Sequence, residues 1–183
     1  MLVFRRATAS EHPTRLGLRL TILSLELFYH RTNMIITTFA ALACLLVTIG
    51  IHAEGLSIIR LEIGRHPVGE RLRLIIVVSA SVLLHMLEIG LYAAVIWMLN
   101  VVVDVGDIVG AREFSAMDYF YYSAQTFTTL GSGDLSATEG LRLIASIEPL
   151  NGLVLIAWTG AFTYWTMEHY WSVKTSKRVQ DKR

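Results

Sequence analysis

Apolar residues fall into three long runs along the chain, and most charged and turn-forming residues lie between them. The runs cover residues 34–59, 74–103 and 141–168. Each run exceeds the ~20 residues that an α-helix needs to cross the hydrocarbon core of a bilayer. The hydrophobic pattern therefore predicts an all-α membrane protein with three transmembrane helices.

A shorter mixed segment, residues 115–128, lies between the second and third runs and is too short to cross the bilayer. It begins with Ser115 and Asp118, in the spacing of a capping box at the start of a helix. Residues 129–134, "TLGSGD", follow at once. We expect a short helix that dips into the membrane, followed by a loop that returns to the same surface. Irregular backbone at this depth survives only where protein buries it or where it lines a pore.

Composition agrees with a lipid bilayer as the main partner. Of the 183 residues, 54% are hydrophobic and 17% are charged, whereas soluble domains carry about 25% charge. Cys44 is the single cysteine, so an intrachain disulfide and a paired-cysteine metal site are excluded. No basic face of the kind that binds nucleic acid is evident, so no nucleic-acid partner is expected.

The basic residues predict the orientation. The linker 60–73 carries four arginines against two glutamates, and the tail 171–183 is also basic. The segment 104–140 carries six acidic residues and one arginine. Under the positive-inside rule, the linker and the C-terminus are cytoplasmic and the acidic segment is outside.

Residues 1–33 do not fit this scheme, because they would lie outside although they carry five arginines. Two interpretations stay open. Residues 16–28 form an amphipathic helix on the membrane surface, or the natural protein begins at Met34 and residues 1–33 come from upstream.

The stretch "YYSAQTFTTLGSGDL" resembles the pore loop of the potassium-channel superfamily, where a pore helix leads into T-x-G-Y-G-D. The resemblance is to small prokaryotic channels with a two-helix pore, in the inner or plasma membrane. It implies a homotetramer with a pore domain over residues 74–170, made of the outer helix, the pore helix, the filter and the inner helix. Glycine takes left-handed backbone angles without strain, so alternating glycines let successive carbonyls point the same way.

The resemblance also implies roles for individual residues. The filter would consist of Thr129, Leu130, Gly131, Ser132, Gly133 and Asp134, with permeant K⁺ or Na⁺ bound by the carbonyls of the first four. Supporting residues would be Tyr121, Tyr122, Gln125, Thr128 and Glu148. The gating hinge and cavity would involve Asn151, Gly152 and Thr159. No enzymatic step is expected, and no cofactor beyond the permeant monovalent cations.

Ser132 stands where the family has a tyrosine that braces the filter. Without that brace, strict K⁺ selectivity and non-selective cation conduction both stay open. A non-conducting scaffold or regulatory subunit is the alternative if the pore has collapsed.

Ionisable residues within the spans form a second candidate site. His85 and Glu88 lie three residues apart on one helical face, and His52 and Glu54 lie towards the end of the first span. Such residues are costly in a membrane and should face protein. They could sense pH, form a neutral hydrogen-bonded cluster that holds the helices together, or bind a metal ion.

Overall fold

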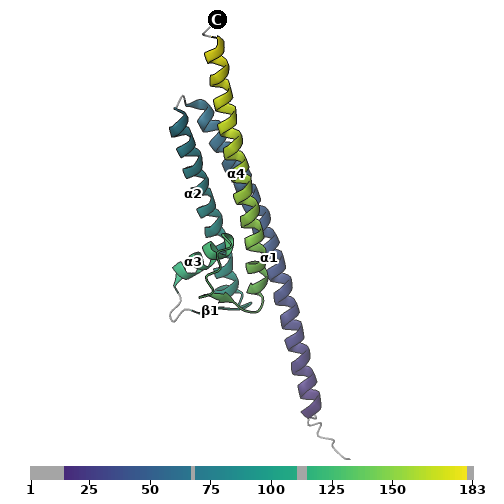
Figure 1. The fold of residues 1–183 in the computed structure, drawn as a ribbon. Coiled ribbons are helices and arrows are strands. Elements are labelled where there is room, and N and C mark those ends of the chain that lie inside the picture. Colours follow the sequence, from purple (N-terminus) through teal and green to yellow (C-terminus); the bar gives the residue numbers. More distant parts are fainter. Residues whose placement is uncertain (1–14, 67–68, 111–114, 181–183) are drawn as a thin grey trace, which may run out of the picture.

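The computed structural model of the chain describes residues 15–66, 69–110 and 115–180. Its elements, in order, are α1 (Arg15–Arg65), α2 (Glu70–Trp97), the π-helical turn η1 (Met98–Val102), β1 (Ile108–Val109), α3 (Ala116–Phe127), β2 (Ser136–Ala137) and α4 (Leu141–Gln180). The long helices α1, α2 and α4 run alongside one another, while α3 and the short strands lie at one end of this bundle (Figure 1).

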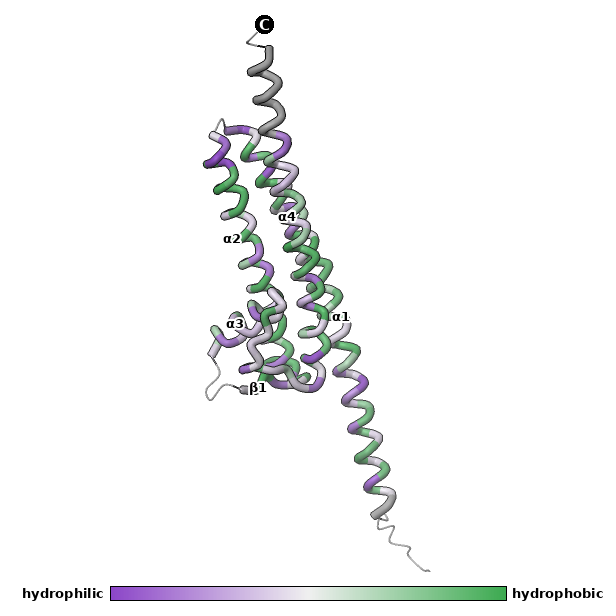
Figure 2. The backbone as a smooth tube through the Cα atoms, in the orientation of Figure 1, coloured by the Kyte–Doolittle hydropathy of each residue, from purple (hydrophilic) through white to green (hydrophobic). Residues whose placement is uncertain are grey.

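The predicted all-α membrane fold is confirmed. Among the described residues, three helical segments are long and apolar enough to cross a membrane, namely Gly17–Arg65, Glu70–Val102 and Leu141–His169. Each contains one of the three apolar runs. Hydrophobic residues dominate the middle of all three helices, and hydrophilic residues gather where α1 and α2 are connected (Figure 2).

The first helix begins earlier than the sequence pattern indicates. Predicted over 34–59, it starts at Arg15 and has 51 residues, which corresponds to about 76 Å at 1.5 Å per residue. A hydrocarbon core is ~30 Å thick, so the first turns of α1 project beyond the end that holds α3 (Figure 1). The Tyr29 hydroxyl donates to the Asp104 carbonyl oxygen at 2.7 Å and ties α1 to the loop after η1.

The expected separate amphipathic helix over 16–28 is therefore wrong for the described residues, because residues 15–33 continue the first spanning helix without a break. The physical reason is that apolar side chains occur all round this segment rather than on one face. Those exposed in the single chain include Leu18, Leu20, Ile22, Leu23, Leu25 and Leu27. Residues 1–14 of the predicted N-terminal segment lie outside the described residues.

The outer and pore helices have bounds within a few residues of those expected, whereas the inner helix is longer than expected. The outer helix, expected over 74–103, corresponds to α2 and η1, and the pore helix, expected over 115–128, corresponds to α3. The inner helix, expected to end at 168, continues to Gln180, so the predicted tail begins as helix. The linker 60–73 is mostly helical, since α1 ends at Arg65 and α2 begins at Glu70.

The hydrophobic core lies where α1, α2, α3 and α4 meet, at the end of the bundle that carries residues 129–134, the predicted filter loop. Its largest fully buried apolar side chains are Tyr92, Phe127, Ile89, Ile96, Leu99, Leu141, Ile144 and Leu155. Burying a large apolar side chain contributes about 1.5–3 kcal/mol. This packing fixes α3 against α2 and α4.

A two-stranded sheet joins the segment before α3 to the segment after the predicted filter, residues 129–134. β1 pairs antiparallel with β2, with Ile108 opposite Ala137. Gly110 has a φ of +126°, and a Cβ there would lie 1.9 Å from the Asp134 carbonyl oxygen. Only glycine fits at this position, where the chain approaches the filter exit.

Candidate ion filter and buried side-chain cluster

The capping box predicted at the start of α3 is present. The Asp118 carboxylate accepts a hydrogen bond from the Ser115 backbone N–H at 2.6 Å and from the Ser115 hydroxyl at 2.9 Å. A carboxylate at this position is also stabilised by the positive end of the helix dipole. The start of α3 is thereby fixed, and its C-terminal end at Phe127 leads directly into the filter loop.

Three successive backbone N–H groups of the filter loop point back to a single residue of α3. The N–H groups of Leu130 and Gly131 donate to the Gln125 carbonyl oxygen at 2.9 and 3.3 Å. The N–H of Ser132 donates to the Gln125 side-chain oxygen at 2.9 Å. In a planar trans peptide, the carbonyl points opposite to the N–H. The carbonyls of Thr129, Leu130 and Gly131 therefore point away from α3, towards the open side of the chain.

Backbone angles in the loop alternate as the glycine spacing indicates. Gly131 and Gly133 have φ values of +51° and +80°, and Thr129 has a φ of +60°. Positive φ is strained for a β-branched residue such as threonine. Strain of this kind persists only where surrounding interactions hold the backbone, and the hydrogen bonds to Gln125 supply such interactions.

A polar contact occupies the place of the missing tyrosine brace. The Ser132 hydroxyl lies within hydrogen-bonding distance of both the Gln125 side-chain oxygen and the Asp134 carboxylate. Gln125 also donates to Asp134 at 3.4 Å. The Ser132 hydroxyl, followed by Tyr121 and Gln125, holds the pKa of the exposed Asp134 below its usual value. The expectation that serine leaves the filter without a side-chain brace is therefore wrong, because its partner is Gln125.

The other predicted supporting residues differ in what they touch. Tyr122 is buried, whereas Tyr121 is 46% exposed and interacts with Asp134. Thr128 donates to the Ala124 carbonyl at 2.7 Å, so its hydroxyl completes the last turn of α3 instead of bracing the filter.

Glu148 of α4 packs against α3. Its side chain is fully buried, and Oε1 lies 2.5 Å from the Ser123 hydroxyl of α3. The same hydroxyl lies 2.9 Å from the Ile89 carbonyl oxygen of α2. Ser123 therefore links α3 with both α2 and α4, a role that the sequence analysis missed.

The residues predicted for the hinge and cavity face the interior of the chain. The Asn151 amide donates to the Thr48 hydroxyl at 2.6 Å and lies 3.1 Å from the Tyr92 hydroxyl, so a cavity-facing Asn151 is wrong. A Cβ on Gly152 would lie 2.1 Å from the Phe127 carbonyl oxygen. This glycine lets the end of α3 approach α4, and α4 runs through it without a break.

Thr159 also faces inward, because it lies eight residues after Asn151 and therefore on nearly the same face of α4. Its hydroxyl lies 3.3 Å from His52 Nε2 and 3.1 Å from His85 Nε2. The expected cavity position of Thr159 is therefore wrong as well. The residue belongs to the second candidate site.

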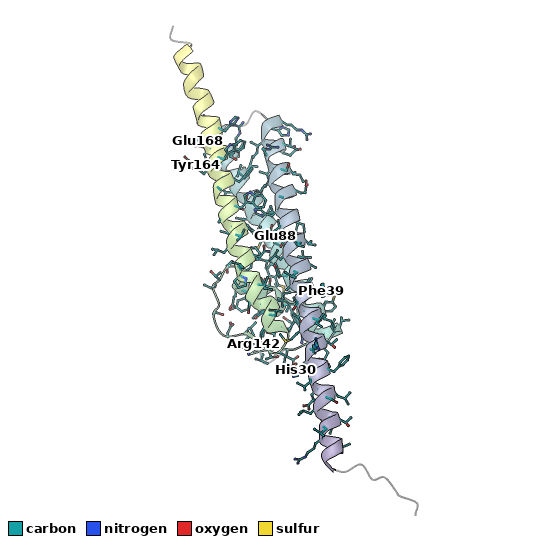
Figure 3. The ribbon with its side chains drawn as sticks, turned by 90° about the vertical axis from the view of Figure 1, so that its right-hand side faces the viewer. His30, Phe39, Glu88, Arg142, Tyr164 and Glu168 are labelled. Atoms are coloured by element: carbon teal, nitrogen blue, oxygen red, sulfur yellow. The ribbon has the colours of Figure 1, made fainter. Side chains whose placement is uncertain are left out.

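That site is a buried cluster between α1, α2 and α4. The Glu88 carboxylate lies 2.8 Å from His52 Nδ1 and 2.9 Å from His85 Nδ1. The two imidazole rings stack with centroids 5.3 Å apart. His52 and Glu88 are completely buried, and Glu88 lies among the helices in Figure 3.

Close helix packing brings these side chains together. Gly55 faces Leu84, and a Cβ there would lie 2.6 Å from a Leu84 methyl group, so α1 and α2 approach closely beside the cluster. Glu54 does not belong to the cluster, which corrects the predicted set. It follows His52 by two positions, which is about 200° around the helix, and its side chain is exposed.

A metal ion was one sequence-based interpretation of these residues. The three side chains offer donor atoms within 4.8 Å of one another. All four ring nitrogens, however, already have hydrogen-bonding partners. The cluster can therefore be held together by hydrogen bonds alone, and a metal ion at these residues stays a prediction.

Three spanning helices, a helix that does not span and a loop of outward-facing carbonyls form a channel-like pore fold. Residues 74–168 match a protein family described as ion channel, and the match covers more than half of the chain. The chain belongs to this ion channel family, whose pore is potassium-channel-like. No curated protein and no solved structure matches it.

Proposed function

We propose that four copies of the chain surround one axis and form a cation channel that passes K⁺ in preference to Na⁺. The observation that carries the proposal is the set of filter hydrogen bonds to Gln125, which turns the carbonyls of Thr129, Leu130 and Gly131 to the open side. Rings of such carbonyls replace the hydration shell of a permeating ion. The proposal adds the Ser132 carbonyl to this set and includes no chemical step.

Four copies are proposed because one chain leaves this surface open. Leu130 is 73% exposed, and apolar side chains of α4 such as Leu150 and Leu153 are also exposed. An open hollow beside the filter is lined by Gln125, Thr129, Gly131, Arg142 and Pro149, among others. In a four-fold assembly, the neighbouring copy would cover this hollow and the carbonyls would face one another across the axis.

Preference for K⁺ is proposed because the filter backbone is held from behind. Ser132 and Gln125 fix the loop by a backbone and a side-chain hydrogen bond, so the carbonyl ring keeps a defined radius without a tyrosine. Asp134, whose lowered pKa keeps it ionised, would stand at the outer mouth and attract cations. The linker and the C-terminus would then be cytoplasmic, in accordance with their basic residues.

The assembly and the flux can be tested on the same purified sample. Native mass spectrometry should give four copies, and liposomes that contain the protein should take up K⁺ faster than protein-free liposomes. A tetramer without flux would support the scaffold alternative. A monomer or dimer would contradict the proposed pore.

A further inference from the structure

Four polar contacts form a closed ring in the buried cluster. The Glu88 carboxylate contacts Nδ1 of His52 and of His85, and the Thr159 hydroxyl contacts Nε2 of the same two rings. The ring contains residues from α1, α2 and α4. His52 and Glu88 are completely buried, whereas Thr159 and His85 are partly buried, with 13% of the His85 side chain exposed.

Each contact needs one hydrogen between its two heavy atoms, so the four contacts need four hydrogens. The threonine hydroxyl supplies one, and two neutral imidazoles supply two. An ionised carboxylate supplies none. One further proton is therefore required, and it resides on an imidazole or on the carboxyl group.

The hydrogen-bond partners of the Thr159 hydroxyl support the count of four hydrogens in the ring. Other helical threonines of the chain, such as Thr48 and Thr166, donate to a backbone carbonyl four residues earlier. Within the described residues, the Thr159 hydroxyl has only the two imidazole nitrogens as partners. Its hydrogen is therefore directed to one ring, and the other ring must donate to its oxygen.

We propose that this ring binds one proton beyond those of its neutral imidazoles and that the proton fastens α4 to α1 and α2. With the proton bound, the net charge of the ring is zero. Without the proton, the ring keeps a buried negative charge. One of its four contacts then has no hydrogen, so two lone pairs face each other. A second proton leaves a buried positive charge. Both changes are unfavourable in a buried site.

Two aromatic side chains pack against the ring. Trp158 of α4 packs at 5.2 Å from the His52 ring, and Phe127 of α3 packs at 5.9 Å from the His85 ring. Glu54 lies two residues from His52, but its side chain is exposed. The other buried ionisable groups in the described part of α1, α2 and α4 are Cys44, Tyr92 and Glu148. They belong to a separate network closer to the filter, where Tyr92 contacts Asn151 and Glu148 contacts Ser123.

Loss of the proton would weaken the contacts between α4 and the helices α1 and α2. The consequence of this for channel gating rests on the proposed channel function. The binding of the proton does not, because it follows from contacts within one chain. In the unfolded chain, the two histidines together bind about one proton near pH 6.5. The folded ring retains its proton above that pH, so stability should fall as the pH rises and the proton is released.

Glu88→Gln is the decisive variant. The glutamine oxygen accepts from one Nδ1–H and the glutamine amide donates to the other Nδ1, so four hydrogens fill the ring with neutral imidazoles only. The variant should therefore fold and retain the contacts to α4. Glu54→Gln is the matched control, because it removes the exposed carboxylate two residues from His52.

The test is thermal unfolding of the purified protein between pH 6 and 10, combined with ¹⁵N NMR of its histidines. Wild type and Glu54→Gln should lose more thermal stability on the alkaline side than Glu88→Gln, because only they release the extra proton of the ring. At pH 7 the wild-type rings and carboxyl group should hold three protons together. Two protons in the NMR spectrum, or the same alkaline loss in Glu88→Gln, would overturn the proposal. Neither readout depends on conduction.

Discussion

The filter loop and the buried ring differ in whether their polar groups find partners within one chain. In the filter, N–H groups bind Gln125 while the matching carbonyls and the Leu130 side chain remain exposed on one chain. In the ring, His52 and Glu88 are fully buried and every polar atom has a partner in the same chain. The filter geometry suits completion by other copies and by ions, whereas the ring is complete in one chain.

The difference predicts different responses to substitution. Changes at the filter should alter which ions pass, with modest effects on the stability of one chain. Changes at the ring should alter stability and the hold on α4, with the carbonyls unaffected. Phe127, the last residue of α3, lies between the two sites, with its ring 5.9 Å from that of His85.

The largest effect is expected at Gly152, where α4 approaches the end of α3 closely. Gly152→Ala would place a Cβ 2.1 Å from the Phe127 carbonyl oxygen, so backbone would have to move. We expect a loss of about 2–3 kcal/mol in stability and a displaced filter, measured by thermal unfolding and flux. Gly50→Ala on α1 is the control, because no atom lies within 4 Å of the added Cβ. It should be neutral or stabilise by up to about 1 kcal/mol, and equal losses in both variants would contradict the packing.

A filter-specific effect is expected from Gln125→Leu. The Ser132 N–H would lose its acceptor, at a cost of about 1–3 kcal/mol locally. The K⁺/Na⁺ reversal potential should move towards zero. Ser132→Ala keeps the backbone hydrogen bond and removes only the hydroxyl, so its shift should be smaller. A larger shift in Ser132→Ala would show that the hydroxyl, and not the backbone bond, holds the loop.

A ring-specific effect is expected from Thr159→Val, which matches the shape of threonine but leaves both Nε2 atoms without the hydroxyl. We expect a loss of about 1–2 kcal/mol in thermal stability, with ion selectivity unchanged. Thr159→Ser should recover most of the loss, because it restores the hydroxyl. Failure of serine to recover stability would assign the effect to the lost methyl group.

The smallest effect is expected at the exposed Asp134. Its pKa is held low, so it stays ionised as the pH falls towards 5, and the stabilisation that it provides is lost only as the pH falls through this lowered pKa. Asp134→Asn should reduce single-channel K⁺ conductance about two-fold at low salt and less at high salt, since salt screens surface charge. Conductance of the wild type that falls between pH 7 and 5 would contradict the lowered pKa.

Local chemistry explains which parts the sequence predicts well. The long apolar runs locate the three spans, and Ser115 with Asp118 locates the start of α3, because both signals act within a few residues. The alternating glycines likewise predict the positive φ angles of the filter.

Features that depend on how helices face one another are not evident from the sequence. The spacing of Asn151 and Thr159 predicts that they share a face of α4, but not that this face meets α1 and α2. The bond between Ser132 and Gln125 depends on how the loop folds back over seven residues. The contact of Thr159 with both histidines joins positions more than 70 residues apart.

The most direct measurement is the reversal potential of purified protein in a planar bilayer, with K⁺ on one side and Na⁺ on the other. A value close to the K⁺ equilibrium potential is expected if the carbonyls of Thr129 to Ser132 form a ring held by Gln125. A value near zero with cations still preferred over anions would contradict the selectivity, and the absence of current would contradict the channel itself.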